Sequence, residues 1–192
     1  MTLTLKDLIF LIKSDLHRYE GKTNFKIFLK NFILNKGFQL TFWYRLCHHF
    51  YMKNNKLLLA FSILFFRTYK EKYGMDFHYK AKIGSGLCLY HAFGTALGPT
   101  VVIGKNANIL HRVTFANVGR GSKKGAPIIG DNVLLAPGSA LIGNIHIGSN
   151  SVLAANTVVS IDIPENSVVA GIPGKVISNK GSHGYILNTD YE

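Results

Sequence analysis

Aliphatic side chains recur at every sixth position in the second half of this 192-residue chain. The clearest series consists of Ile129, Leu135, Leu141, Ile147, Leu153 and Val159. A short fixed period is typical of a solenoid, whose units bury their apolar faces only by stacking on one another. Six residues provide one short strand and one corner, so three units are expected to close one turn of a triangular coil.

The same step continues upstream, although the chain interrupts it twice. Ile83 and Leu89 form one run, and Leu97, Ile103 and Ile109 form another. Residues at about 90–96 and 116–128 break the period and are expected to form projecting loops. A sandwich of short strands is the alternative, but its strands return every 8 to 12 residues. We therefore expect a mainly β fold, a parallel β-helix over residues 76–178, whose handedness the period does not fix.

Residues 1–75 show a different pattern, with apolar side chains three and four positions apart. This spacing places them on one side of a helix, so we expect an N-terminal α-helical domain. Residues 179–192 are expected to form a C-terminal tail after the coil. The longest apolar run, residues 57–66, is much shorter than the roughly 20 residues that cross a bilayer. We expect a buried helix there.

Basic residues are concentrated in the helical half. The chain has a formal net charge of +12, and 14 of its 22 Lys and Arg residues precede residue 81. Such an excess suits a membrane surface, nucleic acid or phosphorylated substrates and does not by itself choose among them. We expect no nucleic-acid partner and leave peripheral contact with the inner membrane open. The two cysteines, Cys47 and Cys88, suggest no disulfide framework, and the N-terminus does not read as a signal peptide, so we expect a cytoplasmic location.

Four segments occur in a specific order along residues 35–178: GFQLTFWYRLCHHF, MDFHYKAKIGSGLCLYHAFG, VTFANVGRGSKKGAPIIGDNV and AGIPGKVI. In this order the chain resembles a hexapeptide-repeat acyltransferase, and it is similar to the serine O-acetyltransferase branch. The resemblance implies a left-handed coil, a homotrimer with the active site between neighbouring coils, and acetyl transfer from acetyl-CoA to a hydroxyl. In this branch a helical domain also joins trimers, and the choice between trimer and hexamer stays open.

His91 matches the catalytic base of that family. A hydroxyl is a poor nucleophile at neutral pH, and a histidine can take its proton during attack on a thioester. Such a base works best when a carboxylate holds its other ring nitrogen. Asp76, fifteen residues earlier, matches the carboxylate of the serine branch, and the alternative is a solvated Asp at the junction between helices and coil.

Two further side chains are expected at the acceptor. Tyr90 precedes the base, and His111 follows it by twenty residues. His111 could position the hydroxyl or the thioester, act as the base itself, or be a plain surface histidine. We expect no metal site, because a zinc centre on such a coil needs converging imidazoles with a close pair in sequence. Cys88 is expected to be a small core residue.

The resemblance also implies contacts with coenzyme A. The long basic loop would fold over the cofactor arm, small corner residues would lie against the pantetheine, and residues near the end of the coil would meet the adenosine phosphates. The candidates are Asn117, Gly119 and Lys123 in the loop, Pro137 and Ala155 at the corners, and Ser160 and Lys175 near the end.

The chain departs from the serine branch at both positions that hold an amino acid. Tyr90 stands where the branch has an aspartate, and Gly125 and Ala126 stand where it has an Arg-His pair. Desolvating a zwitterion without charged partners is costly. We therefore expect an uncharged acceptor, the hydroxyl of a carbohydrate in a capsular or other cell-surface polysaccharide or its precursor. Serine O-acetyltransferase is the first alternative, and a non-catalytic trimeric scaffold is the second.

Overall fold

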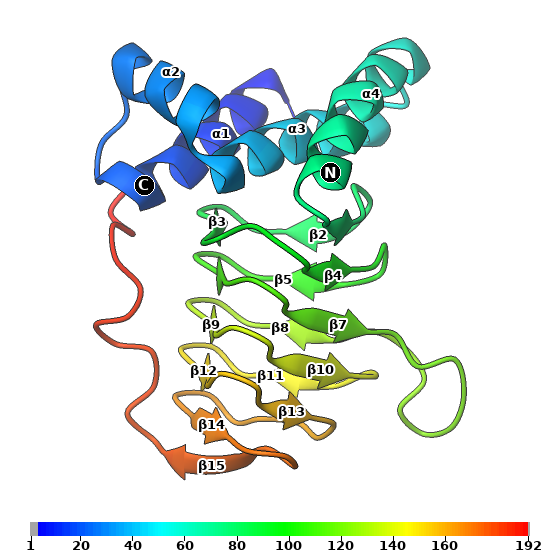
Figure 1. The fold of residues 1–192 in the computed structure, drawn as a ribbon, viewed down its shortest axis with the longest axis vertical. Helices are drawn as coiled ribbons and strands as arrows, with labels where there is room; N and C mark the ends of the chain where they lie inside the picture. Colours follow the sequence, from blue (N-terminus) through cyan, green and yellow to red (C-terminus); the bar gives the residue numbers. More distant parts are fainter. Residues whose placement is uncertain (1–3, 192) are drawn as a thin grey trace.

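The computed structural model describes residues 4–191 and has a layer of helices stacked on one end of a coil of short strands (Figure 1). Residues 1–3 and 192, which the expected first domain and tail include, lie outside the described residues. The helices are α1 (Leu5–Glu20), α2 (Phe25–Leu34), α3 (Lys36–Met52) and α4 (Lys56–Lys72). Each begins at a side-chain cap, Thr4, Asn24, Asn35 or Asn55, which accepts a hydrogen bond from the first turn.

The strands form three parallel sheets that are the three sides of the coil. One sheet contains β1 (Asp76–Phe77), β4 (Ala96–Leu97), β7 (Thr114–Ala116), β10 (Ala140–Ile142) and β13 (Val158–Val159). The second contains β2 (Lys82–Ile83), β5 (Val102–Ile103), β8 (Ile128–Ile129) and β11 (His146–Ile147). The third contains β3 (Cys88–Leu89), β6 (Asn108–Ile109), β9 (Leu134–Leu135), β12 (Val152–Leu153), β14 (Val168–Ala170) and β15 (Lys175–Ser178), and β15 alone pairs antiparallel.

The six-residue period places its aliphatic side chains inside the coil. All six members of the series from Ile129 to Val159 are buried, and so are the five members upstream. At one corner, asparagines at positive φ stack in successive turns and donate hydrogen bonds from one side-chain amide to the next, at 2.9, 3.0 and 3.2 Å. Asparagine tolerates this left-handed backbone well. The ladder consists of Asn106, Asn132, Asn150 and Asn166.

The helical layer closes the first turn of the coil. The edge of a parallel sheet leaves backbone groups without partners, which are costly when they are buried. Arg45 on α3 donates hydrogen bonds to two carbonyl oxygens of this turn, at 2.7 and 2.6 Å, and forms a buried ion pair with Asp15 on α1. The hydroxyl of Tyr44 donates to a third carbonyl at 2.8 Å. The helices are therefore bonded to the coil by side chains that satisfy its open edge.

The helix over the apolar run differs from expectation, because it is not buried within the single chain. α4 packs along one side of α3, and only Ser62 and Phe66 among its residues are buried. Leu57 is 81% exposed, and Phe61 and Leu64 also face outward. Within residues 4–191 the structure contains no helix with the length and apolarity of a membrane span.

The C-terminal segment runs back from β15 along the coil to the helices (Figure 1). Ser182 Oγ donates a 2.6 Å hydrogen bond to the backbone of the asparagine ladder, and Arg18 on α1 donates to the carbonyl of Leu187 at 2.8 Å. Asp190 pairs with His17 at 3.0 Å. The segment thus joins both ends of the coil.

Candidate active site

One corner of the coil carries His91 and His111 in successive turns. Strand β3 pairs with β6 so that Leu89 lies opposite Ile109, and continuing this register by two residues places His91 next to His111. Their ring centroids are 6.1 Å apart and the rings meet edge to face. The structure therefore brings together the two histidines that the sequence selected.

The same corner continues with small residues. Ile109 lies opposite Leu135, and Leu135 opposite Leu153, so the residues two positions further on are His111, Pro137 and Ala155. These three side chains, with His91 at the end nearest the helices, form a column that we call the corner column. Three steps of about 4.8 Å give it a length of roughly 14 Å.

A groove follows the corner column below His91. It has a volume of about 530 Å³ and is lined by His111, Pro137 and Ala155 together with Phe93, Thr114 and Asn156. The Nδ1 atom of His111 is buried and has no hydrogen-bond partner in the described part of the chain. Such an atom is unfavourable unless a bound molecule or water supplies a partner.

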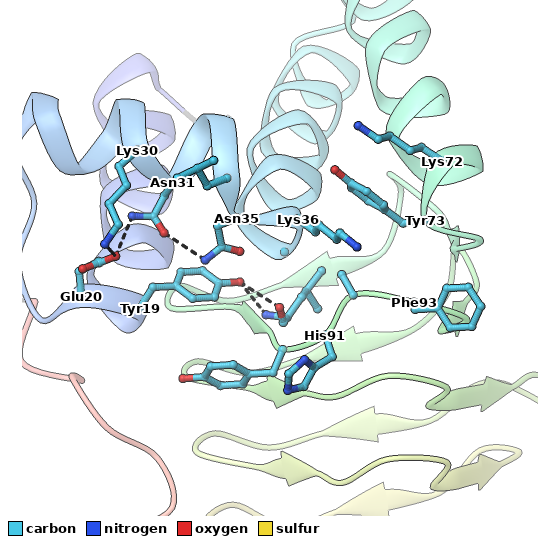
Figure 2. Close-up of a pocket in the computed structure, with 15 residues that line it drawn as sticks. Tyr19, Glu20, Lys30, Asn31, Asn35, Lys36, Lys72, Tyr73, His91 and Phe93 are labelled. Carbon is cyan, nitrogen blue, oxygen red and sulfur yellow. Dashed lines mark hydrogen bonds and ion pairs between the residues drawn. The ribbon is translucent and has the colours of Figure 1, made fainter.

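A larger cavity lies on the other side of His91, between the helical layer and the first turn of the coil (Figure 2). Its volume is about 690 Å³. Both layers supply its walls, which include Tyr19, Glu20, Lys36, Tyr73, Tyr90 and His91. Phe93 borders this cavity and the groove alike. His91 therefore lines the cavity, and its neighbour His111 lines the groove.

The backbone at His91 turns the imidazole outward. Its φ of 52° lies in the left-handed region, and the side chain is exposed. This region is uncommon for residues other than glycine, although histidine is among those enriched there, and it often marks functional sites. A backbone hydrogen bond holds this turn in place: the amide of Arg112, in the next coil, donates to the carbonyl oxygen of Phe93 at 2.9 Å.

Tyr90 lies half-buried against the ring of Tyr19, with centroids 5.9 Å apart. Burial raises the pKa of Tyr90 to about 12, so its phenol stays neutral at physiological pH. Burial likewise raises the pKa of the Cys88 thiol to about 12, and the residue lies in the core. A thiol in this state is a poor nucleophile. No cluster of three potential metal ligands occurs among residues 4–191.

Asp76 is the candidate that the single chain does not bring to His91. Its carboxylate is 87% exposed and pairs with Lys70 at 3.6 Å. Within the described residues it makes no hydrogen bond with His91. An exposed pair of this kind contributes about 0–1 kcal/mol, so it does not fix the position of the carboxylate.

The other candidates for coenzyme contact lie away from the corner column. Asn117, Gly119 and Lys123 belong to the loop that projects from the coil after β7 (Figure 1). Ser160 follows β13, and Lys175 begins β15, both exposed. Of the seven residues predicted to meet the coenzyme, Pro137 and Ala155 line the groove of the single chain.

Sequence reasoning missed three side chains that line the cavity at His91. Phe93, exposed and two residues after His91, could have been noticed as an aromatic in a turn. Lys36 and Lys72 gave no signal, because the sequence does not show which ends of α3 and α4 face the coil.

Comparison with known proteins identifies the relatives of this chain. The sequence profile of the family described as bacterial transferase hexapeptide (six repeats) matches residues 126–160. Serine acetyltransferase 2 of Arabidopsis thaliana is 35% identical over 167 residues, which are 86% of this chain and 51% of the relative. The chain thus spans about half the length of that curated relative.

Solved structures that resemble this chain are also serine acetyltransferases. The serine acetyltransferase of Neisseria gonorrhoeae in complex with serine is 31% identical, with a TM-score of 0.76, over 92% of this chain and 72% of that one. The serine acetyltransferase of Brucella abortus in complex with coenzyme A is 32% identical, with a TM-score of 0.74, over 91% and 67%. The expected left-handed parallel β-helix behind N-terminal helices is confirmed.

The expected carbohydrate acceptor is wrong. These relatives, by sequence and by structure alike, are serine acetyltransferases, and none of them supports a role in capsule or polysaccharide synthesis. The inference assumed that only the positions of Tyr90, Gly125 and Ala126 could hold an amino acid. The structure instead places charged side chains of the helical layer, Glu20 and Lys36 among them, around the cavity at His91.

The fold, the repeat and the extent of similarity lead to one assignment. A solved structure that is 31% identical is covered over 72% of its length, and the family profile falls on the coil that carries the lower part of the corner column. The chain belongs to the hexapeptide-repeat transferase family, among relatives that are serine acetyltransferases.

Proposed function

We propose that the protein is an acyltransferase that moves the acetyl group of acetyl-CoA to the hydroxyl of serine, with His91 as general base. The observation that carries this proposal is that His91, at the first position of the corner column, lines the cavity and contacts His111, which lines the groove. The names of the relatives, which include complexes with serine and with coenzyme A, support the choice of substrates.

The groove suits the arm of coenzyme A. Its corner residues, Pro137, Gly138 and Ala155, have small side chains or none, and the column extends roughly 14 Å from His91. Acetyl-CoA supplies the thioester. His91 takes the proton of the serine hydroxyl as the new ester bond forms, then gives that proton to the sulfur as the C–S bond breaks, so the coenzyme leaves as the thiol. His111, one coil below, would contact the thioester end.

The remaining site residues belong to the proposal on the strength of the family resemblance. Asp76 would turn from Lys70 to hold the other ring nitrogen of His91, which the weak ion pair permits. Asn117, Gly119 and Lys123 would contact the coenzyme from the projecting loop. For the adenosine phosphates, the proposed contacts are Ser160 and Lys175.

The same proposal includes organisation and assembly. We assign residues 1–75 to a helical domain, 76–178 to the acyltransferase coil and 179–192 to a tail. A homotrimer would let the projecting loop of one subunit reach the groove of its neighbour, which explains why the loop residues lie away from the corner column of the single chain. Exposed Leu57, Phe61 and Leu64 on α4 provide apolar area for joining trimers. Peripheral membrane contact stays a prediction from the basic helices.

Thiol release from acetyl-CoA in the presence of serine tests the activity. We expect turnover by the wild type, and a 10²–10⁴-fold lower kcat in His91→Ala, the usual contribution of a general base. His146→Ala is the matched control, since it removes an exposed imidazole from β11 of the same coil. Equal kcat values for His91→Ala and the wild type would refute the assignment of the base.

A further inference from the structure

Serine carries a carboxylate that needs a partner in the site, because an unpaired charge is costly to remove from water. The two positions that grip it in the serine branch are Gly125 and Ala126 here, and neither side chain carries charge. Ala126 is buried, and Gly125 pairs through its backbone with Val118. The partner of the carboxylate must therefore come from elsewhere.

The cavity beside His91 contains one acidic and three basic side chains, all from the helical layer. On one side, Glu20 accepts hydrogen bonds from Lys30 at 3.0 Å and from Asn31 at 3.1 Å (Figure 2). The negative charge of Glu20 is therefore compensated by Lys30, and these hydrogen bonds lower the pKa of Glu20. Glu20 is the carboxylate that lines the cavity, and it pairs with Lys30. Lys36 and Lys72 therefore have no carboxylate partner among the residues that line the cavity.

Lys36 and Lys72 approach the ring of Tyr73 from different sides, in the part of the cavity away from Glu20 (Figure 2). Their ammonium groups are 5.7 and 5.6 Å from the centroid of the Tyr73 ring, within the range of a cation–π interaction. Figure 2 shows Lys36 between Tyr73 and the turn that carries His91. A carboxylate bound there would leave the hydroxyl of the same small molecule on the side of the imidazole.

We propose that Lys36, assisted by Lys72, binds the carboxylate of the acceptor amino acid and so replaces the missing Arg-His pair as the determinant of specificity. This inference rests on the proposed serine acetylation. Because Lys36 contacts the carboxylate away from the reacting atoms and Lys72 adds positive charge beyond the Tyr73 ring, both lysines affect binding of the acceptor more than the chemical step. A charge-assisted hydrogen bond from Lys36 would supply affinity and a preference for an acceptor that carries a carboxylate.

The test compares L-serine with L-serinamide, which lacks the carboxylate charge, in the thiol-release assay. We expect the wild type to prefer serine at least tenfold in kcat/KM. Lys36→Ala should raise the KM for serine ten- to a hundredfold, with kcat within threefold and the KM for acetyl-CoA unchanged. Lys36→Arg, which keeps the cation, should restore most of the affinity, and the Lys36→Ala/Lys72→Ala double variant should treat serine and serinamide alike.

Lys56→Ala is the matched control, because it removes an exposed lysine from the other end of α4. It should leave the KM for serine unchanged. A wild type that releases no thiol with serine overturns the proposed function and this inference together. If the wild type acetylates serine but the double variant keeps its KM and its preference, or if the KM rises equally for serine and serinamide, only the carboxylate contact is refuted.

Discussion

Replacing Gly37 by alanine should disturb the site without touching any reacting group. Gly37 lies in the first turn of α3 where that helix crosses strand β3, and a Cβ there would be 2.0 Å from the carbonyl oxygen of Leu89. It would also be 2.6 Å from the hydroxyl of Tyr19, which bonds the same backbone. A backbone oxygen cannot move aside by a change of rotamer, so α3 and β3 must separate.

The magnitude follows from two opposing contributions. Ordinary contact begins near 3.4 Å, so the 2.0 Å approach requires a shift of about 1.4 Å in a densely packed region. Overpacking of this kind costs about 1–3 kcal/mol. Alanine gains at most about 1 kcal/mol from its helix preference over glycine. The difference is a net loss of up to about 2 kcal/mol, which corresponds to a fall in Tm of up to roughly 8 °C for a chain of this size.

Activity should fall further than stability suggests, because Leu89 lies two residues before His91. A displacement of about 1 Å at a catalytic group can cost about a hundredfold in rate. Thermal unfolding and thiol release measure the two effects, and Gly98→Ala is the matched control, since a Cβ there meets nothing within 4 Å. A Gly37→Ala variant with the Tm and kcat/KM of the control would refute the close contact between α3 and β3.

Three further predictions concern other parts of the site and the helices. Ala155→Trp should raise the KM for acetyl-CoA at least tenfold by filling the groove, with the KM for serine unchanged; equal KM values would place the coenzyme elsewhere. Asp76→Asn should lower kcat tenfold or more at constant Tm, whereas an unchanged kcat would limit Asp76 to its pair with Lys70. Burial lowers the pKa of His48, so below about pH 6.5 the unfolded chain takes up its proton first and the free energy of unfolding decreases. Thermal scans from pH 7.5 to 5 should show a smaller decrease in His48→Gln, and parallel curves would contradict this.

The sequence predicted the coil well because its signal is local and repeated. Each six-residue step specifies a strand, a corner and an inward side chain, and every aliphatic member of the series is buried. The prediction of a buried helix from the apolar run at 57–66 was wrong, because burial of a helix is not set by local sequence. The composition of this run shows that a helix has apolar faces, but which faces another surface covers depends on neighbours that are distant in sequence.

The candidate site was predicted only where residues share the corner column. Its steps are unequal: twenty residues separate His91 from His111, twenty-six separate His111 from Pro137, and eighteen separate Pro137 from Ala155. Only the last step is an undisturbed turn of three hexapeptides. The sequence shows that residues were inserted, but the register of the strands is needed to show which corner keeps its alignment.

The cavity proposed for the acceptor could not be derived from the coil alone, since it lies at the junction with the helices. The first turn of the coil needs partners for its open edge, and Arg45 and Tyr44 supply them from α3. The same docking brings the N-terminal end of α3, with Lys36, above His91 and encloses the cavity. Closure of the edge and formation of the cavity beside His91 are therefore one structural event, and the proposed carboxylate contact at Lys36 depends on it.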